Sequence, residues 1–114
     1  MSISTQANEI IKIGTVALED KKAEDIKCID ISEISIVADA IVITSGNNKN
    51  QIQAMCDELQ ERLGKDGVHP LCVEGYESAN WVLLDYNDVI FHIFDKESRN
   101  FYDLERLYRD GKLI

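Results

Sequence analysis

Apolar positions recur along the chain with two different spacings. The longer spacing, about three to four residues, predicts amphipathic helices, because residues three and four apart share a helix face. The predicted helices are Thr5–Lys22, a second that begins after Asn48 and stops at Gly64 or Gly67, and a third from about Ser98 to Arg109. The third helix has a predicted apolar face and two candidate capping residues: Phe101, Leu104, Leu107 and Tyr108 on the face, Asp95 or Ser98 at the cap.

The other apolar segments are short and bounded by turn-forming residues, which predicts strands. Ala38–Thr44 is apolar on both faces and suits a central strand, whereas the mixed pattern of Ile26–Ile31 suits an edge. A further strand is predicted over Val68–Gly75, with Pro70 near its start, where a missing N–H is harmless. The order of elements predicts one domain, residues 1–114, with an α/β fold of the mixed α+β kind and a sheet of about five strands.

Trp81–Leu84 and Val89–Phe94 are separated by four residues that are rich in turn formers, which predicts an antiparallel hairpin with Asn87 as its pivot. Alternation along the first strand places Trp81, Leu83 and Asp85 on one face and Val82, Leu84 and Tyr86 on the other. Both sets are largely apolar, so the pattern does not decide which set meets the helices. If helices cover only one side, the other is an aromatic patch typical of protein interfaces; the alternative is that Trp81 belongs to the core.

The charge of the chain argues against nucleic acid as a binding partner. The 114 residues carry 21 acidic and 12 basic side chains, a net charge of −9. Binding to nucleic acid through its phosphates needs clustered basic residues, so the charge argues against it and favours a basic protein partner. No apolar run reaches the ~20 residues of a membrane helix, and the N-terminus lacks the pattern of a signal peptide, so we expect a cytoplasmic protein without membrane contact.

Few residues are candidates for catalysis, metal binding or disulfide formation. Cys28, Cys56 and Cys72 are odd in number and have no CxxC spacing, which predicts free thiols packed as small hydrophobes. His92 lies in an apolar strand and suits hydrogen-bonded packing, because no Ser or Cys nucleophile can be paired with it. His69 is expected in solvent.

Ser45–Asn48 joins the predicted central strand to the second helix, where backbone amides can bind a phosphate. Nucleotidyltransferases use a similar layout, with a Gly-Ser pair at this place and two carboxylates at alternate strand positions that hold magnesium. This chain has Ser-Gly and no Asp-x-Asp, so a metal-dependent transferase lacks its ligands. A nucleotide-binding or nucleotide-transferring enzyme that uses Ser45 and Gly46 is kept as the alternative function.

Several short motifs occur in order along the chain: Ala38-Asp39, Thr44–Asn47, Val73–Tyr76, Trp81–Val89, His92–Phe94 and Arg99–Leu107. Together they resemble the ribosomal silencing factor family, also called the Iojap family. The similarity extends from about Ala7 to Arg109, nearly the whole chain. Each motif alone is weak, but the ordered set is specific.

This resemblance implies a fold like that of nucleotidyltransferases without their catalysis, no cofactor and a homodimer. It also implies binding to ribosomal protein L14 on the joining face of the large ribosomal subunit, which blocks joining of the small subunit and represses translation under nutrient limitation. The family's contact surface carries over onto Trp81, with Leu83, Asp85 and Tyr86 as neighbours and Gly75 and Tyr76 as further candidates. The resemblance implies no catalytic or metal-binding residue.

Two positions depart from the family pattern. Asn87 stands where the family usually has Gly, and Tyr108 stands where a second Trp is common.

A third interpretation of the sequence is a dimeric adaptor for a different basic partner.

Overall fold

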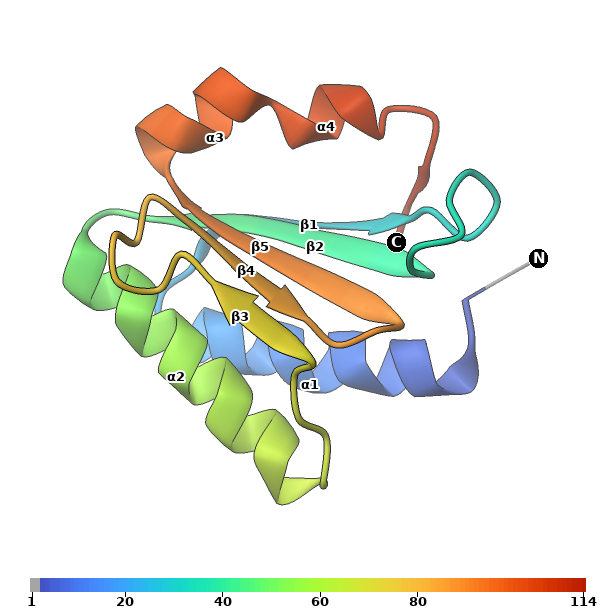
Figure 1. Cartoon of the computed structure of the whole chain (residues 1–114), viewed down its shortest axis with the longest axis horizontal. Helices are drawn as coiled ribbons and strands as arrows, with labels where there is room; N and C mark the ends of the chain where they lie inside the picture. The colour runs from blue at the N-terminus through green and yellow to red at the C-terminus, as the bar shows by residue number, and fades with distance from the viewer. Residues whose placement is uncertain (1–2) are drawn as a thin grey trace.

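The computed structural model describes residues 3–114 as a sheet with helices on both sides (Figure 1). In chain order the elements are α1 (Thr5–Asp20), β1 (Glu24–Asp30), β2 (Ala40–Gly46), α2 (Lys49–Lys65), β3 (Cys72–Glu74), β4 (Trp81–Asp85), β5 (Val89–Asp95), α3 (Lys96–Tyr102), α4 (Leu104–Leu107) and β6 (Lys112–Leu113).

The sheet is mixed, as the sequence predicts. Its strand order is β3-β4-β5-β2-β1-β6, in which β2 and β5 run parallel and the other neighbouring pairs are antiparallel. Every residue of β2 is buried, which confirms its prediction as a central strand. The sheet has six strands because a two-residue strand near the C-terminus, β6, pairs with β1.

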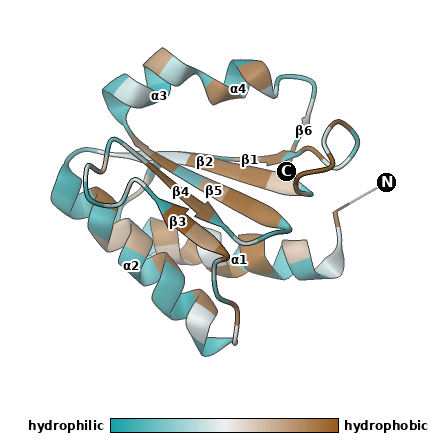
Figure 2. Ribbon diagram, viewed as in Figure 1, coloured by the Kyte–Doolittle hydropathy of each residue, from teal (hydrophilic) through white to brown (hydrophobic). Residues whose placement is uncertain are grey.

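One face of the sheet is closed by the two long helices, α1 and α2, whose apolar side chains pack against those of β2, β4 and β5. Figure 2 shows the apolar stretches of these strands in brown and both apolar and polar positions along the two helices. Phe91 lies at the centre of this core and is fully buried. A Cβ atom on Gly14 would lie 2.6 Å from the ring of Phe91, so the absent side chain lets α1 approach the sheet closely.

The other face carries the short helices α3 and α4 (Figure 1). A smaller core lies beneath them, formed by Ile29, Ile31, Ala38, Ile41, Ile43, Phe94 and Leu104. These residues come from β1, β2, β5, α4 and the β1–β2 connection. Strand β4 therefore lies at the margin of this second layer.

Three predicted boundaries are confirmed. The side chain of Asp95 accepts a hydrogen bond from the N–H of Ser98 at 2.7 Å, so Asp95 caps α3. Helix α2 ends just before Gly67, which adopts a left-handed φ of 77°. Asn87 has a φ of 72° in the hairpin turn, the conformation that Asn and Gly tolerate best.

The prediction of one continuous helix near the C-terminus is wrong. Asp103 takes a left-handed φ of 48°, which divides the segment into α3 and α4 and rotates one relative to the other. The predicted common face is therefore lost: Leu104 is buried and Tyr108 is partly buried, but Phe101 and Leu107 are 80% and 70% exposed.

Two strand predictions also need correction. The stretch 68–71 is not a strand, and β3 has only three residues; Pro70 lacks an N–H, and Leu71 contributes one backbone hydrogen bond to Asp85. Strand β1 begins at Glu24, and β6 pairs with it at Ile29 and Asp30, so β1 is not an edge there.

The three cysteines are free, as predicted, but only Cys56 is fully buried, and burial raises the pKa of its thiol to about 12.

Candidate functional site

Strand β4 presents its two faces to different surroundings. Val82 and Leu84 are fully buried in the core under α1 and α2. Trp81, Leu83 and Asp85 are half-buried and point to the opposite face, because successive strand residues alternate between faces. The predicted alternation is confirmed, and the set that contains Trp81 is the one that α1 and α2 do not cover.

An aromatic surface forms where β4 and β5 emerge beside α3; we define it as Trp81, His92, Phe94, Phe101 and Tyr102. The buried ring of Phe94 is its base, and the indole of Trp81 stacks on it with ring centres 5.1 Å apart. Tyr102 lies 4.6 Å from the indole and Phe101 lies 5.1 Å from Tyr102, edge to face. Aromatic rings at such distances stabilise one another, so the surface is preorganised.

His92 holds the indole from the side. The indole N–H of Trp81 donates a hydrogen bond to Nδ1 of His92 at 3.0 Å. The strand register explains why the side chains of Trp81 and His92 are in contact. Trp81 pairs with Phe94 and Leu83 pairs with His92, so Trp81 and His92 are diagonal neighbours on one sheet face. Burial lowers the pKa of His92 to about 4, so the imidazole is neutral at pH 7 and can accept this bond. His92 is therefore a hydrogen-bonded packing residue, as predicted, and His69 is exposed, also as predicted.

Three of the six residues expected at the contact surface lie together. Trp81, Leu83 and Asp85 share the open side of β4. Asp85 also has a local role, because its side chain accepts the N–H of Asn87 at 2.8 Å and so closes the hairpin turn.

Tyr86 does not join this set, which corrects its inclusion among the neighbours of Trp81. It is 4% exposed, it packs in the core under α1 and α2, and its ring meets Phe91 edge to face at 5.7 Å. Burial raises the pKa of its phenol to about 12. The alternation of the strand continues through Tyr86, so this residue follows Val82 and Leu84 into the core.

Gly75 and Tyr76 lie in the β3–β4 connection and have structural contacts. Gly75 has a φ of 83°, and a Cβ atom there would lie 2.1 Å from the backbone oxygen of Trp81. Any other residue would therefore clash with β4, so the loop needs glycine at this position. The Tyr76 hydroxyl donates to the carboxylate of Asp57 on α2, with oxygen distances of 2.9 and 3.1 Å. These two residues position the start of β4, and Tyr76 faces α2 instead of the aromatic surface.

Phe101 and Tyr102 belong to the aromatic surface although the sequence pattern, which predicts one continuous helix, does not indicate it. The pairing of His92 with Trp81 is likewise not predicted above. A signal for that pairing exists: a hairpin closed by Asp85–Val89 sets the register, and the register makes the two residues diagonal neighbours.

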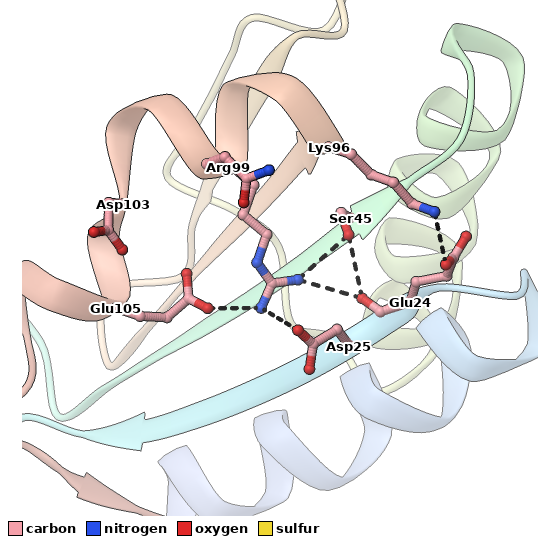
Figure 3. A pocket seen from close by; sticks show the side chains of 8 residues that line it. Glu24, Asp25, Ser45, Lys96, Arg99, Asp103 and Glu105 are labelled. Atoms are coloured by element: carbon pink, nitrogen blue, oxygen red, sulfur yellow. Dashed lines mark hydrogen bonds and ion pairs between the residues drawn. The ribbon is translucent and has the colours of Figure 1, made fainter.

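A second candidate site lies at the carboxyl ends of the parallel strands β2 and β5, where open α/β sheets commonly bind ligands. A hollow of about 370 Å³ is found there, beside Ser45 and α3 (Figure 3). The buried side chain of Arg99 occupies its wall, donating to the hydroxyl of Ser45 at 3.3 Å and pairing with Glu105 at 3.1 Å and Asp25 at 3.5 Å. The Ser45 hydroxyl is therefore already committed to a contact within the chain.

The hollow has mixed charge. Lys96 pairs with Glu24 at 3.0 Å and lowers the pKa of that carboxyl. Among residues 3–114, no three His, Cys, Asp or Glu side chains are arranged to hold a metal ion. Within the same range, no helix is long and apolar enough to cross a membrane.

The fold and the aromatic surface define a mixed α/β protein with one closed sheet face and one partly open face. A family model described as "Ribosomal silencing factor during starvation" matches residues 4–114, and the chain belongs to the ribosomal silencing factor family. The ribosomal silencing factor of Bacillus subtilis is 41% identical over 104 residues, which cover 91% of this chain and 88% of that protein. The family is not a known class of enzyme.

Two further comparisons agree with this assignment. A crystal structure of a Chromobacterium violaceum protein has a TM-score of 0.87 and 34% identity, covering 95% of this chain and 87% of that one. The maize protein named "Protein Iojap, chloroplastic" is 27% identical over 98 residues, which cover 86% of this chain and 42% of that protein.

Proposed function

We propose that this protein binds the large ribosomal subunit through ribosomal protein L14 at the joining face, blocks joining of the small subunit and so represses translation under nutrient limitation. The observation that carries the proposal is the aromatic surface, left partly uncovered by α3 and α4 in a chain of the ribosomal silencing factor family. The mechanism is steric, so the surface supplies affinity and no catalytic step.

The composition of the surface suits a protein interface. Trp and Tyr are the residues that most often contribute large shares of binding energy, and Phe101 and Tyr102 are 80% and 49% exposed beside Trp81. We propose Trp81, Leu83, Phe101 and Tyr102 as the contact residues, with Asp85 at the rim. Gly75 and Tyr76 contribute by positioning β4.

Charge supports a basic partner. The chain has a net charge of −9, which accelerates association with a positively charged protein surface and disfavours contact with RNA phosphates. The proposed partner is therefore a basic ribosomal protein, and sequence-specific contact with nucleic acid is not part of the proposal.

The test is sedimentation of purified large and small subunits through a sucrose gradient at a magnesium concentration that allows joining. We expect the protein to travel with the large subunit and the joined peak to decline. Trp81→Ala is expected to weaken binding by about 30-fold, roughly 2 kcal/mol, while the protein stays folded. The matched control is Val16→Ala, which shortens an exposed side chain on α1, on the other side of the sheet. Normal joining in the presence of the wild-type protein would refute the proposal.

The hollow beside Ser45 is the observation that favours the alternative, a nucleotide-binding enzyme. Nucleotide and magnesium titrations followed by thermal unfolding separate the two functions, since a ligand that binds only the folded state raises the melting temperature. We expect no shift, because Arg99 engages the Ser45 hydroxyl.

We further propose that the protein is a cytoplasmic homodimer. Exposed apolar side chains remain outside the aromatic surface, among them Ile36 and Val37 in the β1–β2 connection and Leu71 before β3. Light scattering during size-exclusion chromatography over a range of concentrations would test the dimer; a monomer mass at every concentration would contradict it.

A further inference from the structure

The imidazole of His92 has two nitrogen atoms with different surroundings. Nδ1 accepts the indole N–H of Trp81 at 3.0 Å. A neutral imidazole that accepts through Nδ1 carries its proton on Nε2. The Trp81 contact therefore fixes the tautomer of His92 and makes Nε2 a hydrogen-bond donor.

The Nε2 atom is not fully buried, although His92 as a whole is only 7% exposed. In the described part of the chain, the only fully buried side-chain polar atom without a partner is the Tyr86 hydroxyl. No residue of 3–114 accepts a hydrogen bond from Nε2, so this atom retains contact with solvent. Side chains of a strand stand roughly perpendicular to the sheet, which directs the distal nitrogen of the ring outward.

Trp81 has no free polar group to offer a partner. An interfacial Trp commonly uses its N–H for a hydrogen bond across the interface, but here that donor is already engaged with His92. The indole can present only its ring. If a partner covers the aromatic surface, two side-chain polar groups lose water, the exposed hydroxyl of Tyr102 and the Nε2–H of His92. The Tyr102 hydroxyl can donate or accept, whereas the Nε2–H can only donate, so its burial is unfavourable unless the partner supplies an acceptor.

We propose that His92 is a specificity-determining residue of the aromatic surface: its Nδ1 positions the Trp81 indole, and its Nε2–H donates a hydrogen bond to an oxygen of the ribosomal protein. The inference rests on the proposed function and deepens it. The lowered pKa of His92 agrees with it, since a neutral ring keeps both roles at pH 7.

Two substitutions separate the two nitrogens. The side-chain oxygen of Asn can occupy the place of Nδ1, so His92→Asn keeps an acceptor for Trp81 and removes the outer donor. The amide nitrogen of Gln can reach the place of Nε2, so His92→Gln keeps the outer donor and removes the acceptor. His69→Asn and His69→Gln are matched controls at an exposed histidine that is not part of the aromatic surface.

Two measurements are made on each variant: affinity for purified large subunits, and the fluorescence and near-ultraviolet circular dichroism of the single Trp. His92→Asn is expected to bind about 3- to 10-fold more weakly with the Trp81 signal unchanged, the loss expected for one hydrogen bond. His92→Gln is expected to change the Trp81 signal and also to bind more weakly, because the indole loses its orientation. Both His69 variants should match the wild type.

Wild-type affinity in His92→Asn would overturn the inference while leaving the proposed function intact. Failure of the wild-type protein itself to bind large subunits would overturn both. A measurement on the wild-type protein covers the case in which a variant does not fold: nitrogen-15 NMR of His92 should find Nε2 protonated and Nδ1 unprotonated, and the reverse assignment would also overturn the inference.

Discussion

The two faces of the sheet differ in how completely they are covered. Under α1 and α2, the side chains of Val82, Leu84 and Phe91 are fully buried in a continuous apolar core. Under α3 and α4 the core is smaller, and Trp81 is only partly covered at its margin. The first pair of helices has 16 and 17 residues, whereas the second pair has 7 and 4, so the second layer is too short to reach across β4.

This difference separates stability from recognition within one strand. Neighbouring residues of β4 alternate between the closed core and the partly open aromatic surface. Substitutions one position apart should therefore affect different properties: the free energy of unfolding for Val82 or Leu84, and partner affinity for Trp81 or Leu83.

The largest expected effect is on the closed face. Phe91→Ala should lower the free energy of unfolding by about 3–5 kcal/mol, because it removes a fully buried ring and leaves a cavity between α1 and the sheet. Trp81→Ala, on the other face, should cost less because the indole is only partly buried. Urea unfolding followed by circular dichroism measures both. Equal losses would mean that Trp81 is as much a core residue as Phe91.

The second prediction concerns the pH dependence of the partly open face. Burial lowers the pKa of His92 from 6.5 to about 4, so between these values the unfolded chain binds more protons than the folded one. Stability is therefore retained above pH 6.5 and lost as the pH falls towards 4, by about 3 kcal/mol. Urea unfolding at several pH values measures the loss.

The His92→Gln variant isolates this contribution. Carboxyl groups with lowered pKa values, including that of Glu24, also reduce stability in acid, but they are common to both proteins. The difference in unfolding free energy between wild type and variant should decline between pH 6.5 and 4. A constant difference over that interval would contradict the burial of His92.

Much of the fold follows from the sequence because local signals and burial agree. The unbroken apolar run of β2 fits a strand covered on both faces, and Asp95 and Asn87 fit a helix cap and a left-handed turn. The break in the last helix had no such signal, since Asp103 is a residue that an uninterrupted helix tolerates. A two-residue strand such as β6 is too short to leave a periodic pattern.

The aromatic surface could be predicted only in part. Alternation groups Trp81, Leu83 and Asp85, but both faces of β4 are apolar, so the pattern alone cannot say which one the long helices cover. Phe101 and Leu104 share the predicted helix face, but the break at Asp103 separates them, and Leu104 is buried while Phe101 is exposed. The exposure of Phe101 is therefore a consequence of tertiary structure.

A smaller effect is expected where α3 is attached to the sheet. Arg99→Met should lower the free energy of unfolding by about 1–2 kcal/mol, since the buried Ser45 hydroxyl loses a donor while the ion pairs, which are partly exposed, contribute little. Tyr102 lies on the same helix, so affinity for the large subunit should also fall a few-fold. Lys96→Met is the control, because its ion pair with Glu24 is solvent-exposed and little change is expected. Unchanged affinity in Arg99→Met would mean that α3 keeps its place without this contact.

The smallest expected effect is at the hairpin turn, which belongs equally to both faces. Asn87 holds a left-handed φ of 72°, which Gly adopts without a Cβ penalty, so Asn87→Gly should raise the free energy of unfolding by about 0.5 kcal/mol. Asn87→Ala should lower it by about 1 kcal/mol, because Ala has the Cβ atom without the polar group that helps Asn. Affinity for the large subunit should stay constant in both variants, since the turn lies at the far end of β4 from Trp81. A change in affinity that tracked neither stability nor the Trp81 signal would place the turn itself in contact with the partner.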